Sequence, residues 1–534
     1  MRLFRLTSLL CACVVTIAAA PIVTGVYNGA SWLPPGLPNS GVAQGAILTV
    51  TGTGLGPTTL AEAFTYPLPT TQGIGGTTIQ VKVGTVTENC IMIYSLNSQV
   101  AAILPSATPV GNGTLTVSFG GASSSFAIQV VAAGFGTLTL NEGGTGPAVV
   151  TDTNFVPITM INPAHPGESL ILWGSGLGAV SGDETEPPPE TNLYPTGLQV
   201  LVQNQEATVQ YGGRSSSPGL DQINFVVPAG ISGCKISLAV TAKGVTGNIT
   251  TTSVAPAGQA TCGDTVNALT AANLQKAISS GVLNIAGVEA SRFVGANDTL
   301  VAPFTSFSLN TLIRSYGGTF APSIGNCLAY EVEGTSLTYA DPIQPTSFLS
   351  AGSNLVLTGP AGTRTVPASS TGFYSATLAT QPSTYLGPGA YSVTNGSGGA
   401  NVGPFNWSFT VPPLVVPSIP ASINPSQDLT LTWTGGSAYP VVSITLFNGV
   451  AATSSLNSYV QILCSANAAA GSFTIPAAYL SLLPPSGFGT PTKAGVNIQV
   501  AGIQNASFTV SGSPGLDDGF FDVFVYSGSV ATIQ

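Results

Sequence analysis

The chain has 534 residues, of which 44% are hydrophobic and only 6% are charged, and its formal net charge is -10. This length corresponds to about three to five domains, and short apolar runs spread along the chain argue against a disordered polypeptide. The chain has 11 basic residues against 21 acidic ones. Without a basic patch to neutralise phosphates, nucleic-acid binding is not expected.

The first 20 residues are typical of a secretory signal peptide. Arg2 and Arg5 precede an apolar run from Leu6 to Ile17, and three alanines at 18–20 provide a cleavage site. Cleavage before Cys13 would instead give a lipoprotein, but the apolar run continues beyond that residue. No later segment has 18 consecutive apolar residues, so no transmembrane helix is expected in the mature chain. We therefore expect a protein that is secreted or held at the cell surface.

A glycine-rich stretch, Gly45–Gly56, recurs one domain later as Gly167–Gly178. In both copies an apolar, β-type run enters a turn. The turn glycines are Gly52, Gly54, Gly56, Gly174, Gly176 and Gly178. A dinucleotide-binding loop needs a helix directly after its glycines, whereas Pro57 follows one copy and residues 179–182 show no helical pattern after the other. We interpret these glycines as structural turn residues.

The repeat defines the first two predicted domains, residues 21–134 and residues 135–264. Short strand-like runs bounded by Gly, Pro, Asn and Ser predict an antiparallel, immunoglobulin-like β-sandwich in each. Asn112-Gly113 is a strong signal for a tight hairpin. Pro105 and Pro228 end equivalent strands, because proline cannot donate a hydrogen bond within a sheet.

The second copy carries the segment Gln222-Ile223-Asn224-Phe225-Val226-Val227-Pro228 after its glycine turn. This combination resembles the IPT/TIG type of immunoglobulin-like repeat found in secreted proteins of soil acidobacteria. The first copy departs from the pattern, with Gln99-Val100-Ala101 in place of Gln-Ile-Asn. The resemblance covers residues 22–264 well and the remainder loosely. It implies the fold and export, and it brings no catalytic residues.

The pattern changes in the second half of the chain. Residues 265–413 predict a mostly-β domain with one short helix near 270–280, capped by Thr270 and ended by Gly281. The pair Pro412-Pro413 indicates a domain boundary. Residues 414–534 predict a C-terminal β-sandwich. The expected fold class is therefore all-β, with tandem immunoglobulin-like sandwiches and one short helix in the third region.

The mature chain would retain five cysteines, widely spaced. They are Cys90, Cys234, Cys262, Cys327 and Cys464. Their spacing fits no metal knuckle, and export permits disulfides. We predict a Cys234–Cys262 disulfide because these residues bracket two strand-like runs of one domain. The state of the other three is open.

Candidate catalytic and metal sites are few. His165 is the only histidine, and no Gly-x-Ser-x-Gly motif surrounds a serine that it could activate, so we interpret it as a loop residue. The densest charge is an acidic loop containing Asp183, Glu184, Glu186 and Glu190. It could hold calcium, although a solvated loop is favoured. We expect no catalytic residue, cofactor or metal.

These observations favour an exported, non-enzymatic binding, adhesion or structural protein whose partner is a glycan, the cell envelope or another surface protein. Some aromatic residues could stack on sugars, namely Tyr27, Trp32, Tyr66, Tyr194 and Trp407. Trp173 and Trp433 lie inside strand runs and are predicted in the core.

Two alternatives stay open. The first is an extracellular carbohydrate-active or other hydrolase with its site in residues 265–413. Its acidic residues would be Glu289, Asp298, Glu331, Glu333 and Asp341. The second is an outer-membrane β-barrel, which the 40 prolines disfavour.

Overall fold

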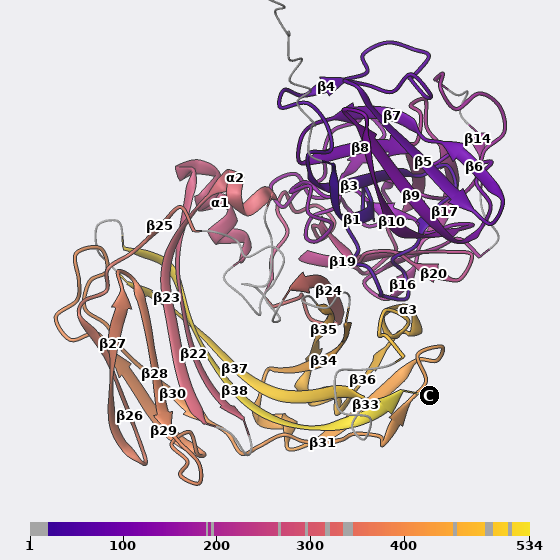
Figure 1. Ribbon diagram of the computed structural model, residues 1–534. Helices are drawn as coiled ribbons and strands as arrows, with labels where there is room; N and C mark the ends of the chain where they lie inside the picture. Colours follow the sequence, from indigo (N-terminus) through magenta and orange to yellow (C-terminus); the bar gives the residue numbers. More distant parts are fainter. Residues whose placement is uncertain are drawn as a thin grey trace, which may run out of the picture.

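The computed structural model describes residues 20–187, 191–193, 197–264, 269–293, 297–314, 321–334, 345–451, 457–485, 495–510 and 515–533. Of the predicted signal peptide, only Ala20 falls within these ranges. The described chain is all-β, with tandem immunoglobulin-like sandwiches, as expected from its sequence. In Figure 1 the two N-terminal sandwiches, coloured indigo to purple, lie at one end of a long curved sheet formed by the second half of the chain.

Two five-stranded sheets form the first sandwich. One has the order β1 (Ile22–Asn28), β3 (Ile47–Thr53), β8 (Gln99–Ile103), β7 (Ile91–Ser95) and β4 (Ala61–Glu62). The other has the order β2 (Val42–Ala43), β10 (Ala122–Val131), β9 (Gly111–Phe119), β5 (Thr77–Val83) and β6 (Val86–Asn89). Leu48 and Val50 of one sheet share a core with Val81 and Leu115 of the other. This is the expected packing of inward-facing alternate residues.

The hairpin predicted at Asn112-Gly113 is wrong. Both residues lie at the start of β9, where Gly113 pairs with Val83 on one side and Ile128 on the other. The tight turn instead follows β9 at Gly120-Gly121, where both residues have positive φ. A two-residue hairpin needs that conformation, and two glycines adopt it more readily than Asn-Gly.

The second sandwich repeats this arrangement. Its first sheet has the order β11 (Gly136–Thr137), β13 (Ser169–Ser175), β18 (Asp221–Val226), β17 (Thr208–Arg214) and β14 (Thr191–Asn192), with β12 (Val150–Asp152) also pairing with β13. Its second sheet has the order β16 (Gln205–Glu206), β15 (Gln199–Val202), β19 (Gly233–Ala242) and β20 (Val245–Thr246), with β21 (Thr250–Val254) also pairing with β19. Strands β7 and β17 occupy equivalent places, and each carries a bulge just before a tyrosine, Tyr94 or Tyr211. The duplication therefore extends to irregularities of pairing.

One long sheet runs through the second half of the chain. Its order is β24 (Asn326–Gly334), β35 (Asn457–Asn467), β34 (Val441–Ala451), β37 (Val496–Val510), β38 (Leu516–Ile533), β22 (Val282–Phe293), β23 (Asp298–Ser308), β28 (Phe373–Ala379), β27 (Gly362–Ser370), β26 (Asn354–Gly359), β29 (Gly389–Thr394) and β30 (Asn406–Val411). Two short strands join it, β25 (Ser347–Phe348) beside β23 and β32 (Ser422–Ile423) beside β38. A separate three-stranded sheet contains β31 (Val416–Ser418), β33 (Leu429–Thr434) and β36 (Ser472–Ile475).

The segments expected as separate domains, residues 265–413 and residues 414–534, are joined through this sheet. Strand β38 has 18 residues and is about 60 Å long, and in Figure 1 it curves with β37 along the sheet. Phe521 and Val523 of β38 pack into one core, whereas Ala531 packs into another. One strand pair therefore contributes to both cores.

The helices are short and lie between sheets. They are α1 (Ala271–Ser280), α2 (Leu309–Arg314), α3 (Ala477–Leu480) and the 3-10 turns η1 (Gly436–Ala438) and η2 (Ala468–Ala470). Helix α1 is the predicted one. The Thr270 hydroxyl accepts from the amide of Asn273, and Gly281 ends the helix with a φ of 79°. The buried face of the helix carries Leu274 and Ala277.

Two disulfides tie distant segments together. Cys234 bonds to Cys262, the pair expected from the sequence, and Cys327 bonds to Cys464 between facing residues of β24 and β35. Cys90 is a buried free cysteine. The Cys234–Cys262 disulfide lies in the same cluster as Leu274 of α1, so it also anchors the second sandwich to the second half of the chain.

A buried ion pair links the first two sandwiches. Nε of Arg214 lies 3.1 Å from Oδ1 of Asp221, and both side chains are almost fully buried. Nη1 of Arg214 donates to the carbonyl of Gly45 in the first sandwich at 3.0 Å. Oδ2 of Asp221 accepts from the amides of Gly176 and Leu177 at 2.7 and 2.8 Å. Burial raises the pKa of Asp221, while Arg214 and the two amides oppose that rise.

The variant Arg214→Ala should lose about 3–5 kcal/mol of stability, because Asp221 would stay buried without its cation. Urea unfolding followed by tryptophan fluorescence measures this loss. The matched control is Arg314→Ala, which removes an exposed partner of Glu142 and should cost less than about 1 kcal/mol. Equal losses in the two variants would contradict this role for Arg214.

Thiol chemistry should report the disulfides directly. We expect peptide mapping of the non-reduced mature chain to recover Cys234 crosslinked to Cys262 and Cys327 crosslinked to Cys464. Cys90 should resist alkylation in the folded protein and react after unfolding, because its thiol is buried. Recovery of alkylated Cys234 or Cys327 without reduction would contradict the pairing.

Candidate ligand-binding surface

Two of the six repeated glycines are not in turns, because Gly52 lies within β3 and Gly174 within β13, while the other four follow the ends of these strands. A Cβ on Gly52 would fall 1.9 Å from the carbonyl oxygen of Ile22. Gly176 has a φ of 116°, and a Cβ there would lie 2.4 Å from the carbonyl oxygen of Gly134. The described residues after Gly56 and after Gly178 form no helix. The turns therefore lack the helix N-terminus that a dinucleotide phosphate needs.

His165 and the acidic loop make structural contacts, one within its own loop and the other to the first sandwich. Nδ1 of His165 lies 3.7 Å from Oε2 of Glu168 in the same loop. The two carboxylate oxygens of Glu184 accept from the amide and hydroxyl of Ser106 in the first sandwich. Among the described residues, no group of three or more His, Cys, Asp or Glu could hold a metal ion. Glu190 lies outside those residues.

The acidic residues of the hydrolase alternative do not form one site. Glu331 and Glu333 lie on β24, whereas Glu289 lies on β22, five strand spacings away in the sheet. That spacing corresponds to about 24 Å along the sheet, against the 5–10 Å or so that glycoside hydrolysis requires. Glu289 instead faces Asp522 of β38, and burial raises the pKa of Glu289. Asp341 lies outside the described residues.

The carboxylates of Asp298 and Glu333 accept structural hydrogen bonds. Oδ2 of Asp298 accepts from the amides of Tyr385 and Leu386. Oε2 of Glu333 accepts from the hydroxyl of Tyr27, 3.1 Å away in the first sandwich. Each carboxylate thus has a structural partner on a different element.

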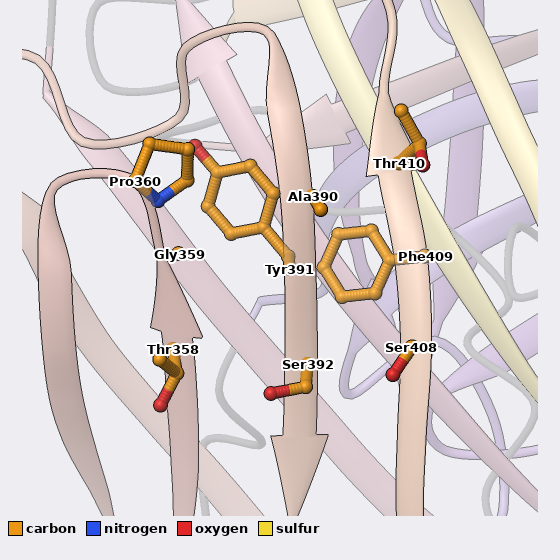
Figure 2. A pocket seen from close by; sticks show the side chains of 9 residues that line it. All are labelled: Thr358, Gly359, Pro360, Ala390, Tyr391, Ser392, Ser408, Phe409 and Thr410. Carbon is orange, nitrogen blue, oxygen red and sulfur yellow. The ribbon is translucent and has the colours of Figure 1, made fainter.

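A hollow of about 620 Å³ does lie in residues 265–413, over strands β26, β29 and β30. Figure 2 shows Tyr391 and Phe409 side by side on β29 and β30, with Ser392 and Ser408 along the same strands and Thr358 on the neighbouring β26. The Tyr391 hydroxyl donates to the carbonyls of residues 385 and 387, and burial raises its pKa to about 12. The hollow is shallow and contains no Asp, Glu, His or Lys in its lining, so it provides no acid–base pair.

Three of the aromatic residues considered for sugar stacking are used inside the molecule. Tyr27 packs against Trp32 with ring centroids 5.6 Å apart, and its bond to Glu333 places the pair at the junction with β24. Trp407 packs against Phe521 in a core cluster. These three side chains are partly buried and make packing contacts within the molecule.

The remaining aromatic residues differ in how deeply they are buried. Trp433 is 6% exposed and lies in the core, as predicted. Trp173 belongs to no described core cluster and is only partly buried, so its predicted core position is wrong. Its strand explains why: Leu170 and Leu172 of β13 face the core, and Trp173 alternates with them onto the outer face. Tyr66 is 48% exposed, and Tyr194 lies outside the described residues.

Partly buried Trp173 lies beside an exposed aromatic residue, Phe155, in an arrangement that the sequence did not reveal. The ring of Phe155 lies 6.2 Å from that of Trp173, centroid to centroid, with the planes inclined at 37°. Phe155 is 64% exposed and the adjacent Val156 is 46% exposed. Nε1 of Trp173 donates to the hydroxyl of Thr151, which fixes the indole against β12. We call Phe155, Val156 and Trp173 the aromatic platform.

Phe155 is held in an unfavourable backbone conformation. Its φ is 63°, in the left-handed region that bulky side chains rarely adopt. Oδ1 of Asp152 accepts from the amides of Asn154 and Val156 and closes the turn around it. Such strain costs about 1–3 kcal/mol and is concentrated at functional sites. The turn therefore holds an exposed aromatic ring over Trp173 at the expense of stability.

Polar residues of β18 lie beside the platform. Gln222 faces Trp173 across the β13–β18 pair, and Asn224 faces Ile171 on the same outer surface. These are the Gln and Asn of the Gln-Ile-Asn segment, whose central Ile223 faces the core. Gln222 is nearly buried, and Oδ1 of Asn224 is buried without a hydrogen-bond partner among the described residues, so the amide nitrogen of Asn224 is the polar group that the site adds to the aromatic rings.

Comparison with known proteins identifies no family, since no family model and no curated protein matches the chain. Among solved structures, the chain is similar to the SGBP-B of a Bacteroides ovatus mixed-linkage glucan utilization locus, at 9% identity over 86% of this chain and 98% of that one, with a TM-score of 0.16. It is also similar to Sidekick-1 immunoglobulin domains 1–4, at 9% identity over 96% and 99% of the two chains, with a TM-score of 0.12. The titin I9–I11 tandem matches at 9% identity over 69% and 92%, with a TM-score of 0.12. TM-scores this low do not bear on function.

The buried carboxyl of Glu331 should make stability depend on pH. Burial raises its pKa from 4.5 to about 8, and Asn39 opposes the rise. Between these two pH values the folded state keeps a proton that the unfolded chain releases. The stability that the protonated carboxyl contributes is therefore fully present below about pH 4.5 and is lost as the pH rises to about 8.

The variant Glu331→Gln, which resembles the protonated acid, should flatten this dependence. Melting temperatures measured from pH 5 to pH 8 should fall less in the variant than in the wild type. Glu206→Gln, at an exposed residue, is the control and should follow the wild type. A variant curve parallel to that of the wild type would contradict the assignment.

Proposed function

We propose that this chain is an extracellular, non-catalytic binding protein that holds a glycan on the aromatic platform of its second sandwich. The observation that carries the proposal is Phe155, an exposed ring kept over Trp173 by a strained turn. Packing does not account for that strain, because the ring is mostly outside the core. Sugar rings present apolar C–H faces, for which exposed aromatic rings are suitable partners.

The remainder of the chain supports a binding role. The carboxylates considered for hydrolysis are dispersed or serve as structural hydrogen-bond acceptors, and the hollow over β26, β29 and β30 has no acid–base pair. A rigid β-sandwich that presents a short turn is a common arrangement for recognition. We further propose that the first two sandwiches are of the IPT/TIG type, which their shared glycine turns and bulges support.

An extracellular location is supported by two observations. The leader has the pattern of a signal peptide, and two disulfides are of the kind that persists in oxidising surroundings. No helix among the described residues has the length and apolar character needed to cross a membrane.

Substitutions at the platform should separate binding from stability. Phe155→Gly removes the ring and places at φ 63° the residue that tolerates it best. We expect its melting temperature to equal or exceed that of the wild type, while retention on a glycan array falls at least tenfold. Trp173→Ala should lose retention as well.

Phe64→Ala is the matched control, because Phe64 is 83% exposed on the first sandwich, away from the platform. It should keep wild-type retention. The proposal is contradicted if Phe155→Gly and Trp173→Ala bind like the wild type, or if the chain turns over a glycan that it does not retain.

A further inference from the structure

We infer that the platform selects neutral glycans and excludes acidic ones, with a pyranose ring resting on Trp173 and Phe155 and the amide of Asn224 bonding its hydroxyls. This inference rests on the proposed function and names the chemical class of its ligand. Three features of the surface support it: its charge, its polar groups and the angle between its rings.

The charge around the platform is the first feature. Strands β12, β13, β17 and β18 and the turn at 153–157 contain a single cation, Arg214. That guanidinium is buried and paired with Asp221, so it cannot reach a ligand. Carboxylate and sulfate groups are recognised mainly by arginine and lysine. An acidic sugar would find no such partner here, and it would meet the carboxylate of Asp152 at the base of the turn.

The polar groups are the second feature. Asn224 is partly exposed and Gln222 is 9% exposed, and both lie on the outer face beside Trp173 and Ile171. Oδ1 of Asn224 is buried without a hydrogen-bond partner in the described part of the chain, so its amide nitrogen is the atom that can meet a sugar hydroxyl, as a donor. Alternate residues of one strand lie about 7 Å apart, so Asn224, beside Ile171, extends the contact along β18 beyond Gln222, which lies beside Trp173.

The ring geometry is the third feature. The planes of Phe155 and Trp173 are inclined at 37°, so the exposed surface is bent and open rather than a slot between parallel walls. An open surface of this kind accepts a ring within a longer chain, because the chain can continue past the platform at both ends. Oligosaccharides should therefore bind more tightly than monosaccharides of the same sugar.

Isothermal titration of the mature chain tests the inference with two groups of probes. The neutral probes are cellohexaose, xylohexaose and mannohexaose, and the acidic probes are hexagalacturonate and a heparin hexasaccharide. We expect at least one neutral hexasaccharide to bind at least tenfold more tightly than either acidic probe. Trp173→Ala should weaken this binding at least tenfold, and Asn224→Ala should weaken it about fivefold without lowering the melting temperature by more than a degree or two.

The outcomes are distinguishable. An acidic probe that binds as tightly as the best neutral one, with the binding lost in Trp173→Ala, would overturn the inference and leave the proposed function standing. Wild-type affinity in Asn224→Ala would overturn the assigned role of that amide. Absence of binding by every probe would overturn both the inference and the proposed function.

Discussion

The ion pair between Arg214 and Asp221 is the interaction on which the N-terminal half of the structure depends. A buried arginine and a buried aspartate each carry a large desolvation cost, and only a partner with further hydrogen bonds offsets it. Here the partners are distributed across the molecule: Asp221 receives the amides of the glycine turn, and Arg214 reaches Gly45 in the neighbouring sandwich. The pair therefore fixes the turn, strand β18 and the first sandwich relative to one another.

This fixed arrangement bears on the platform. Asp221 is the first residue of β18, and the next residue, Gln222, faces Trp173. On the opposite side of β13, strand β12 ends at Asp152, which closes the strained turn around Phe155. The aromatic rings and the amides are thus held by strands whose register is set on both sides. Because these side chains are already held in place in the free protein, little of their conformational entropy is lost when a ligand binds.

Local signals in the sequence were sufficient for much of the fold. The strand runs of the first two sandwiches and the capped helix α1 depend on neighbouring residues, and both were predicted, whereas Gly52 and Gly174 end strands instead of lying in the predicted turns. Asn112-Gly113 shows the limit of such signals, since Gly120-Gly121 forms the turn instead. The apolar run Leu170–Trp173 hid the alternation that turns Trp173 outward, and Phe155 gave no sign beyond an aromatic residue in a polar turn.

Long-range pairing could not be predicted in the same way. Strand β24 pairs with β35, and the disulfide between Cys327 and Cys464 joins residues separated by 137 positions. Nothing near either cysteine specifies the other. Similarly, the length of β38 allows it to serve two cores, a property that emerges only once its neighbours are in place. The predicted boundary near Pro412 therefore divided a sheet that the fold keeps continuous.

Hydrogen exchange of the mature chain with and without a bound neutral hexasaccharide tests the central claim most directly. Binding at the platform should slow exchange in residues 150–156, 171–175 and 221–226 and leave the other sheets unchanged. Protection confined to strands β26, β29 and β30 would place the ligand in the shallow hollow instead and contradict a site at Trp173.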